Sequence, residues 1–319
     1  MAGRIVFPLL AAALLAGCTK DTDGGDGALK RIELTAVFSP GLEAESETLN
    51  NPASKAPVDE QTALTVGFAR ADQSTPGGAF GAYGDMSNGV RTKGSGAQKF
   101  AFSAGQDPYY LPNGRQTKMV AWAPATHINS EGTVNWTLNG QQDVITAPVQ
   151  TGSATSPMGT FAFEHRLAQI QFWLYTDKAV TQALWGNITN IIVLDRCSKC
   201  SFTPSTADAT GAVTFDTAST SSFYAKFPSG YTPVPAPLTA AQFGEGMMIM
   251  PQETAVELKI AIITSIGGSR TVTIPARTYP RSTVTKIKLK FTFSEIQFED
   301  TTTIKSWEDA YTATGDVTI

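Results

Sequence analysis

Histidine is nearly absent from this chain of 319 residues, in which His127 and His165 are the only two. A three-histidine metal site therefore cannot be built, and that excludes many metal-dependent hydrolases. Neither histidine is accompanied by a serine or cysteine in a nucleophile-elbow setting, so the structural interpretation of both outweighs a role as general base. We expect no catalytic residue, no metal and no cofactor, and hence no enzyme.

Charge is also scarce, since only 16% of the residues are Asp, Glu, Lys or Arg. The 24 basic and 28 acidic residues give a net charge of −4, which offers no broad positive field for a phosphate backbone. Nucleic acid is therefore not an expected partner.

Cysteine occurs three times, at Cys18, Cys197 and Cys200. The pair Cys197 and Cys200 supplies two thiolates where a structural zinc site needs four ligands, and no βαβ setting for a redox site is visible. The spacing predicts either a local disulfide or two free thiols at the end of a strand.

The leading segment contains an apolar run, Ile5–Leu15, that is too short to span a bilayer as a helix. It is followed by Leu-Ala-Gly-Cys, the pattern of a bacterial lipoprotein signal, which predicts removal of residues 1–17 and lipidation of Cys18. The alternative is an ordinary signal peptide with an incidental cysteine. Several acyl chains would make the anchor effectively permanent, and residues 18–30 would form a flexible tether.

Sustained helical periodicity is missing, except for a short helix expected at Lys178–Trp185. Short alternating runs separated by turn residues predict an all-β chain of sandwich or Greek-key type, with domains at residues 56–160 and 161–319. Beyond the first strand, the expected strands are Leu64–Phe68, Phe100–Phe102, Tyr109–Leu111, Thr117–Pro124, Thr133–Leu138, Phe161–Tyr175, Ile188–Leu194, Val213–Phe215, Met247–Met250, Val256–Ile263, Thr271–Ile274 and Ile287–Phe293.

Residues 31–55 combine a strand and a loop. The strand Arg31–Phe38 alternates, with Ile32, Leu34, Ala36 and Phe38 on one face, and only Val37 breaks the alternation. The polar loop that follows carries Lys55 as the only basic residue before Leu64. Lys55 is either an ordinary solvated charge or the position where a trypsin-like protease cuts before Ala56.

Tryptophan is dispersed over five positions. Exposed indole rings could form a carbohydrate platform, although scattered tryptophans are more often core residues. A monomeric surface lipoprotein that binds glycans is therefore an alternative function. The five positions are Trp122, Trp136, Trp173, Trp185 and Trp307.

The order of these features resembles that of the fimbrillins, the type V pilins of Bacteroides-like bacteria. The resemblance extends over essentially the whole chain and depends on order and spacing more than on any single motif. The segment Thr19–Asp23 is similar to a surface-export signal of such bacteria. The features are Cys18, Ile32–Phe38, Lys55, Leu64–Phe68, Tyr109–Pro112, Met119–Pro124, Phe163–Ile170, Ile304–Asp309 and Gly315–Ile319.

The resemblance implies two transthyretin-like domains in tandem, outer-membrane export as a lipoprotein, and maturation by an arginine- or lysine-specific protease. Arginine is expected at the cut, whereas Lys55 followed by Ala56-Pro57 stands there. Loss of the first strand would open a groove that a strand from a neighbouring pilin fills, with residues 305–319 as the donor. The function implied is a stalk subunit of an adhesive surface fimbria, and an uncleaved anchor subunit is the alternative.

Overall fold

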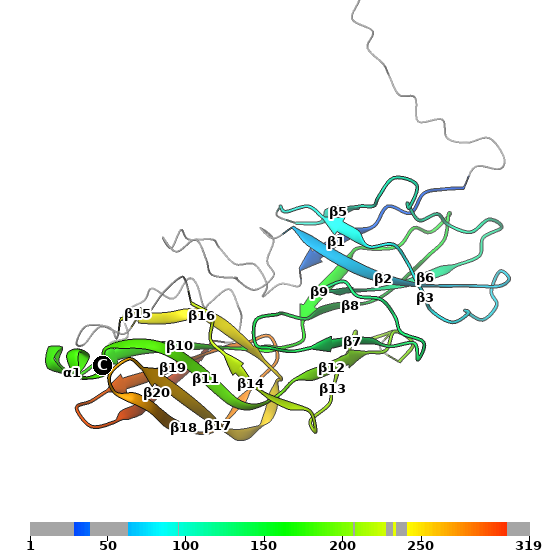
Figure 1. Cartoon of the computed structure of the whole chain (residues 1–319). Coiled ribbons are helices and arrows are strands. Elements are labelled where there is room, and N and C mark those ends of the chain that lie inside the picture. The colour runs from blue at the N-terminus through cyan, green and yellow to red at the C-terminus, as the bar shows by residue number, and fades with distance from the viewer. Residues whose placement is uncertain are drawn as a thin grey trace, which may run out of the picture.

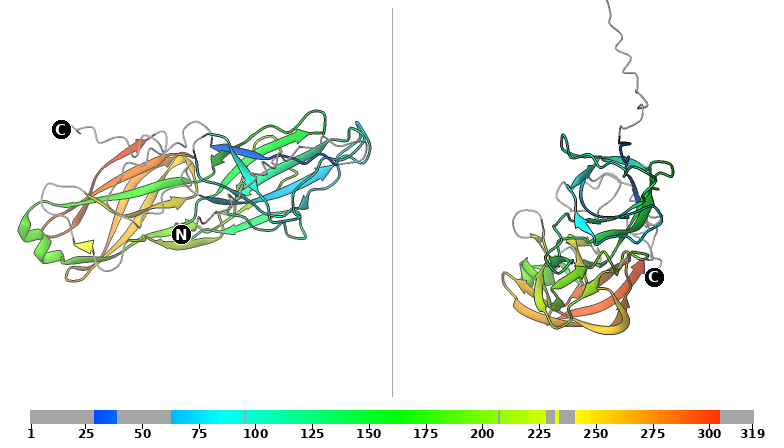
Figure 2. Two further views of the ribbon diagram at one scale, coloured as in Figure 1. Left: turned by 90° about the horizontal axis from the view of Figure 1, so that it is seen from above. Right: turned by 90° about the vertical axis from the view of Figure 1, so that its right-hand side faces the viewer.

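The computed structural model of the chain describes residues 29–38, 63–94, 96–206, 208–227, 232–233 and 241–304. These residues are mostly β-strand and contain one short helix, α1 (Ala179–Trp185), for which Lys178 is the N-cap residue. Two lobes lie end to end, with α1 at the far end of the second lobe (Figures 1 and 2). The predictions of an all-β chain and of the short helix are confirmed.

The first lobe is one sheet that closes on itself. Its order is β3-β2-β4-β5-β1-β9-β8-β6, and β2 also pairs with β6, so seven of these strands form a closed barrel with β3 beside β2. The strands are β1 (Thr35–Phe38), β2 (Leu64–Asp72), β3 (Gly84–Asp85), β4 (Gly89–Arg91), β5 (Gln98–Ala101), β6 (Thr117–Ala123), β8 (Ile145–Gly152) and β9 (Phe161–His165).

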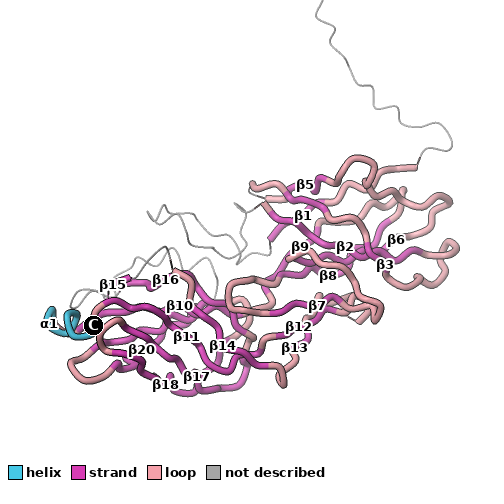
Figure 3. Tube along the Cα trace, viewed as in Figure 1, coloured by secondary structure: helices cyan, strands magenta, loops and turns pink. Residues whose placement is uncertain are grey.

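The second lobe contains two larger sheets, ordered β16-β10-β19-β20 and β14-β11-β17-β18, with β15 paired to β11. In a small third sheet, β13-β12-β7, β7 pairs with β12, although the two strands lie far apart in the sequence. Figure 3 shows strands running through both lobes. The strands are β7 (Val134–Thr137), β10 (Ala168–Thr176), β11 (Asn187–Cys197), β12 (Lys199–Phe202), β13 (Thr214–Phe215), β14 (Thr220–Tyr224), β15 (Thr232–Pro233), β16 (Ala241–Ile249), β17 (Gln252–Thr264), β18 (Gly268–Tyr279), β19 (Val284–Phe291) and β20 (Ile296–Ile304).

The apolar run Phe161–Tyr175, expected to be strand-like in its second half, contains two strands that belong to different sheets. β9 pairs with β1 and β8, whereas β10 pairs with β16 and β19. Between them the buried Arg166 donates to the Thr146 hydroxyl at 2.6 Å and to the Thr210 carbonyl at 2.9 Å. The first sheet thus continues through the five residues of β9, past the predicted boundary at residue 160. The division into two domains stays a prediction.

Three strands of five or more residues were not expected from the sequence, namely β8, β14 and β20, whereas Tyr109 forms only an isolated bridge with Arg31. In β8 the register against β6 shifts between Ala147 and Gln150, and this irregularity includes Pro148. Proline lacks the N–H that a ladder needs, so it is tolerated at a bulge. A bulge also breaks the alternation that sequence patterns reveal.

The core of the barrel is aromatic. The Phe68 ring lies 5.1 Å from Phe100 and 5.7 Å from Phe161, measured between ring centroids. Trp122 of β6 is fully buried opposite Gly67 of β2, where an added Cβ would lie 2.6 Å from the indole Nε1. Only glycine therefore fits at position 67, and β2 and β6 can approach closely at the barrel seam.

Candidate functional site

β1 is an internal strand of the barrel. It pairs in antiparallel fashion with β5, through Thr35 with Lys99 and Ala36 with Gln98. It pairs in parallel with β9, where Phe38 lies opposite Phe163. We call the space that β1 occupies between β5 and β9 the β1 slot. Because β1 is one of the seven strands of the closed barrel, the sheet is continuous only while a strand fills the slot (Figure 1).

The inward side chains of this segment are deeply buried, as the alternation predicts. Ile32, Leu34, Ala36 and Phe38 are each no more than 2% exposed, whereas Arg31 and Glu33, on either side of Ile32, are exposed. Full burial of a large aliphatic or aromatic side chain contributes about 1.5–3 kcal/mol. Hydrophobic burial therefore provides most of the free energy that holds the strand in the slot.

The extended residues before β1 also bond to the barrel. Ile32 N–H donates to the Pro108 carbonyl at 2.8 Å, and Phe100 N–H donates to the Leu34 carbonyl at 3.0 Å. Lys99 Nζ lies 2.8 Å from Glu33 Oε2 and holds the pKa of that carboxyl below its ordinary value, by its hydrogen bond and its charge. This ion pair is solvent-exposed on both sides, so it adds little to stability.

Arg91 of β4 lies beside both the last residue of β1, Phe38, and the first residue of β2, Leu64. Its guanidinium carbon lies 4.8 Å from the centroid of the Phe38 ring, and Arg91 pairs in register with Leu64, the first residue of β2. The side chain is fully buried and donates to the carbonyls of Thr92 at 3.1 Å and Gly94 at 2.9 Å. Sequence reasoning missed Arg91, because nothing in Gly-Val-Arg marks an arginine as buried.

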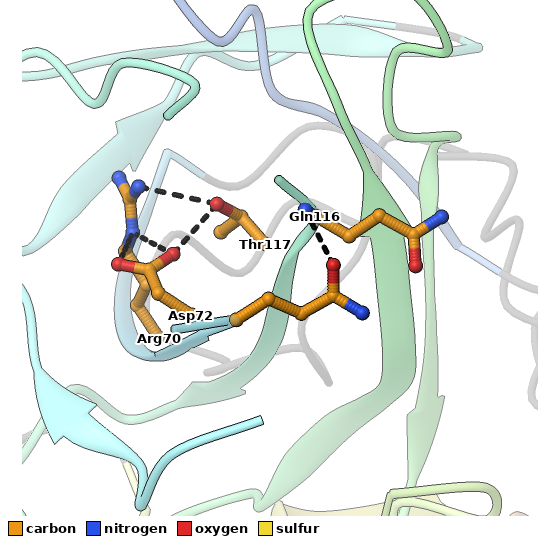
Figure 4. A network of polar contacts seen from close by, with 5 residues as sticks. Arg70, Asp72, Gln116 and Thr117 are labelled. Atoms are coloured by element: carbon orange, nitrogen blue, oxygen red, sulfur yellow. Dashed lines mark hydrogen bonds and ion pairs between the residues drawn. The ribbon is translucent and has the colours of Figure 1, made fainter. Parts of the chain in front are cut away.

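The seam between β2 and β6 has its own polar contacts, remote in sequence from β1 (Figure 4). Thr117 donates to Asp72 at 2.6 Å, and Arg70 Nε lies 2.9 Å from the same carboxylate. The Gln116 N–H donates to the Gln73 side chain at 3.0 Å. The bond between Asp72 and Thr117 joins β2 to β6, and none of these bonds uses β1, so the seam keeps its contacts if the slot is emptied.

The residues on which the predicted processing depends, Cys18, Lys55 and Ala56, lie outside the described residues, as does the predicted donor segment 305–319. What the structure defines is the two ends of the intervening segment. The described residues stop at Phe38, the last residue of β1, and resume at residue 63, directly before β2.

Cys197 and Cys200 are buried free thiols at the junction of β11 and β12. Ser198 between them is bonded on both sides, donating to the Ser219 carbonyl and accepting from Leu138 N–H at 2.7 Å. Extended backbone separates Cα atoms three residues apart by about 10 Å, beyond the roughly 7 Å that a disulfide tolerates. The geometry favours the free-thiol alternative.

Burial, together with the neighbouring Cys197, raises the pKa of Cys200 to about 12. The Cys200 thiol therefore stays protonated at pH 8 and unreactive. In a chain with Cys18 replaced by serine, a thiol reagent should react slowly with the native protein and with two thiols after denaturation. Denaturation without reductant that yields no reactive thiol would instead show a disulfide.

The two histidines lie apart. His165 is buried and paired with Asp143, whereas His127 is exposed, with its Nδ1 3.1 Å from Asp85 Oδ2. The Ser282 hydroxyl near His165 donates to its backbone carbonyl and not to its ring. Within the described ranges, no three His, Cys, Asp or Glu side chains gather as a metal site would require. No helix in the described part is long and apolar enough to cross a membrane.

Most tryptophans are core residues. Trp122, Trp136 and Trp185 are between 0% and 6% exposed, and Trp173 is partly buried beneath the Lys286 ammonium, 5.0 Å from its ring centroid. Trp307 lies outside the described residues. These four rings therefore offer no open aromatic platform for a sugar.

Solved structures that share this fold include two from Bacteroides species. A candidate cell adhesion protein from Bacteroides uniformis is 13% identical, with a TM-score of 0.59 over 87% of this chain and 98% of that chain. One from Bacteroides ovatus is 17% identical, with a TM-score of 0.55 over 86% of this chain and 97% of that chain. At such identities the likeness concerns the fold alone. Among curated proteins, none matches the chain in sequence.

Comparison with protein families confirms the resemblance seen in the sequence. The pattern of the fimbrillin-like family matches residues 54–307. This match covers most of the chain, including β2 to β20. The chain therefore belongs to the fimbrillin-like family.

Proposed function

We propose that this protein is a structural subunit of an adhesive cell-surface fimbria, exported to the outer membrane as a lipoprotein through Cys18. The observation that carries the proposal is the place of β1. It fills an internal slot of the barrel, yet only one segment connects it to β2, and that segment contains Lys55 as its single basic residue.

Cutting after Lys55 removes the covalent link between the lipid anchor and the body. The protease would be arginine- or lysine-specific, and the mature chain would start at Ala56. If the first strand then leaves, β5 and β9 each present an unpaired edge, and the inward face of the slot loses its apolar cover. An unpaired edge of this kind is a template for a strand from another chain.

A strand from a second pilin subunit would restore the barrel. Main-chain hydrogen bonds to β5 and β9 supply affinity, and the buried positions of the slot supply specificity. Because the donor segment and the slot are different surfaces, the contact is heterologous and does not close, so it propagates as a filament. The finer architecture, two transthyretin-like or Greek-key sandwiches in tandem, belongs to the same proposal.

A lysine-specific protease tests this function on the purified full-length precursor without its lipid. We expect cleavage after Lys55 and fibres visible by electron microscopy that are absent from the uncut sample. An inert segment, or cleavage without any assembly, would contradict the proposal.

A further inference from the structure

A cleft lies where the chain passes from the first lobe to the second. Four separate parts of the chain line it, namely Arg166 between β9 and β10, the residues around β13, the start of β17 and the turn between β18 and β19. Its volume is about 310 Å³, within the range of about 300–1,000 Å³ that small-ligand sites usually have. The cleft shares no residue with the β1 slot.

Arg166 forms the buried end of the cleft. Its side chain is 2% exposed, and its Nη1 lies 3.0 Å from Glu164 Oε2. Nε donates to the Thr146 hydroxyl, and Nη2 donates to the Thr210 carbonyl. A guanidinium carries five N–H donors, and these three contacts leave one donor on each terminal nitrogen. Arg166 is therefore fixed in position and can still donate to a ligand.

Arg281 places a second positive charge at the cleft. It is exposed, and within the described residues its side chain takes part in no hydrogen bond or ion pair. Burial, opposed by the Glu164 carboxylate and reinforced by the charge of Arg281, lowers the pKa of Arg166 to about 10. Arg166 therefore stays charged at pH 7, and two like charges face the same cleft. An anion between them would be attracted by both.

The other walls restrict what kind of anion fits. Val213, Phe215 and Pro251 present apolar surface to the cleft, and the first two pack against the hydrophobic core. Glu253 is exposed beside them, and an ionised carboxylate accepts hydrogen bonds but donates none. A suitable ligand thus combines an anionic group with hydrogen-bond donors and an apolar face. An acidic sugar has all three, in its carboxylate, its hydroxyls and the C–H groups of its ring.

We propose that the cleft binds one acidic monosaccharide unit of a glycan, with the sugar carboxylate between Arg166 and Arg281. The sugar hydroxyls donate to Glu253, and a C–H face of the ring packs on Phe215. Arginine suits this role because its planar N–H fork matches the geometry of a carboxylate. The inference goes beyond the proposed function, since it requires neither cleavage after Lys55 nor assembly, and each can fail without the other.

Ligand-observed NMR on the full-length chain without its lipid tests this site. Saturation transfer should reach glucuronate, galacturonate or N-acetylneuraminate and not glucose, which lacks the carboxylate. Titration of the acid that binds gives its dissociation constant. Arg281→Gln should weaken binding at least about tenfold, since it removes a charge-assisted contact at an exposed position. Arg281→Lys should retain part of the affinity, because the charge remains.

Arg270→Gln is the matched control. It makes the same change of charge at another exposed arginine, whose guanidinium carbon lies 5.6 Å from the Trp185 ring centroid at the α1 end of the second lobe. It should leave the dissociation constant unchanged. Equal weakening by Arg270→Gln and Arg281→Gln would reduce the effect to net charge and overturn the site. Failure of all three acids to bind would overturn it as well.

Two further outcomes test the class of ligand. Inorganic sulfate that competes as strongly as the sugar would show a general anion site and overturn the sugar assignment. Glu253→Gln should change the dissociation constant by less than about twofold, because the amide oxygen still accepts from a hydroxyl. Loss of binding in this variant would mean that Glu253 pairs with a cationic group, such as the ammonium of an amino acid, and would contradict a sugar.

Discussion

Replacing Phe38 by alanine is expected to lower the free energy of unfolding of the barrel lobe by about 3–5 kcal/mol in the uncut chain. The side chain is 2% exposed, packs against Phe163 and covers the buried Arg91 guanidinium. Its removal leaves a cavity and takes away the aromatic face beside a buried cation. Urea unfolding followed by tryptophan fluorescence and circular dichroism measures the change.

Val37→Ala is the matched control, since Val37 neighbours Phe38 on the other face of β1 and is only partly buried. It should cost well below half as much as Phe38→Ala. Equal effects of the two changes would mean that β1 is not held by its inward face. The account of the slot would then fail, whatever the fate of Lys55.

Replacing Lys55 by alanine is expected to abolish maturation altogether. Between Phe38 and Leu64 no other lysine or arginine is present, so a basic-residue-specific protease has no second place to cut the connection. The variant should remain attached to the membrane with its first strand in the slot, and it should form no fibres. Its melting temperature should equal that of the original chain. Immunoblotting of cell fractions and electron microscopy measure these outcomes.

Lys93→Ala is a suitable control for that experiment, because Lys93 is an exposed lysine of the barrel beyond the connecting segment. It should leave cleavage and assembly unchanged. Normal fibres from the Lys55→Ala variant would show that release of the anchor does not depend on this residue.

The sequence predicts the parts of this fold in which one face of a strand is buried and the other is solvated. A strand was expected at Arg31–Phe38 for that reason; β1 covers only its last four residues, but the burial of Ile32, Leu34, Ala36 and Phe38 confirms the alternation. Pairing partners are different, because they join segments far apart in the chain and no local pattern encodes them. The insertion of β1 between β5 and β9, and the bonding of β7 to β12, could only be learned from the structure.

The sequence itself points to the residues of the proposed processing, Lys55 through its isolation in a polar loop and Cys18 through a lipoprotein box. Both lie outside the described residues and stay predictions. Arg91 has no such signal, since an arginine beside turn residues is normally solvated and its burial depends on the Phe38 ring and on carbonyls that the fold brings near. β8 was not predicted from the sequence for a related reason, because Pro148 and the irregular register against β6 conceal its alternation.

The most direct test of the account is N-terminal sequencing of the protein recovered from the cell surface. The account predicts a chain that starts at Ala56, without lipid and without β1. A blocked, lipidated start at Cys18 would contradict it and would instead indicate an uncleaved anchor or a monomeric surface lipoprotein.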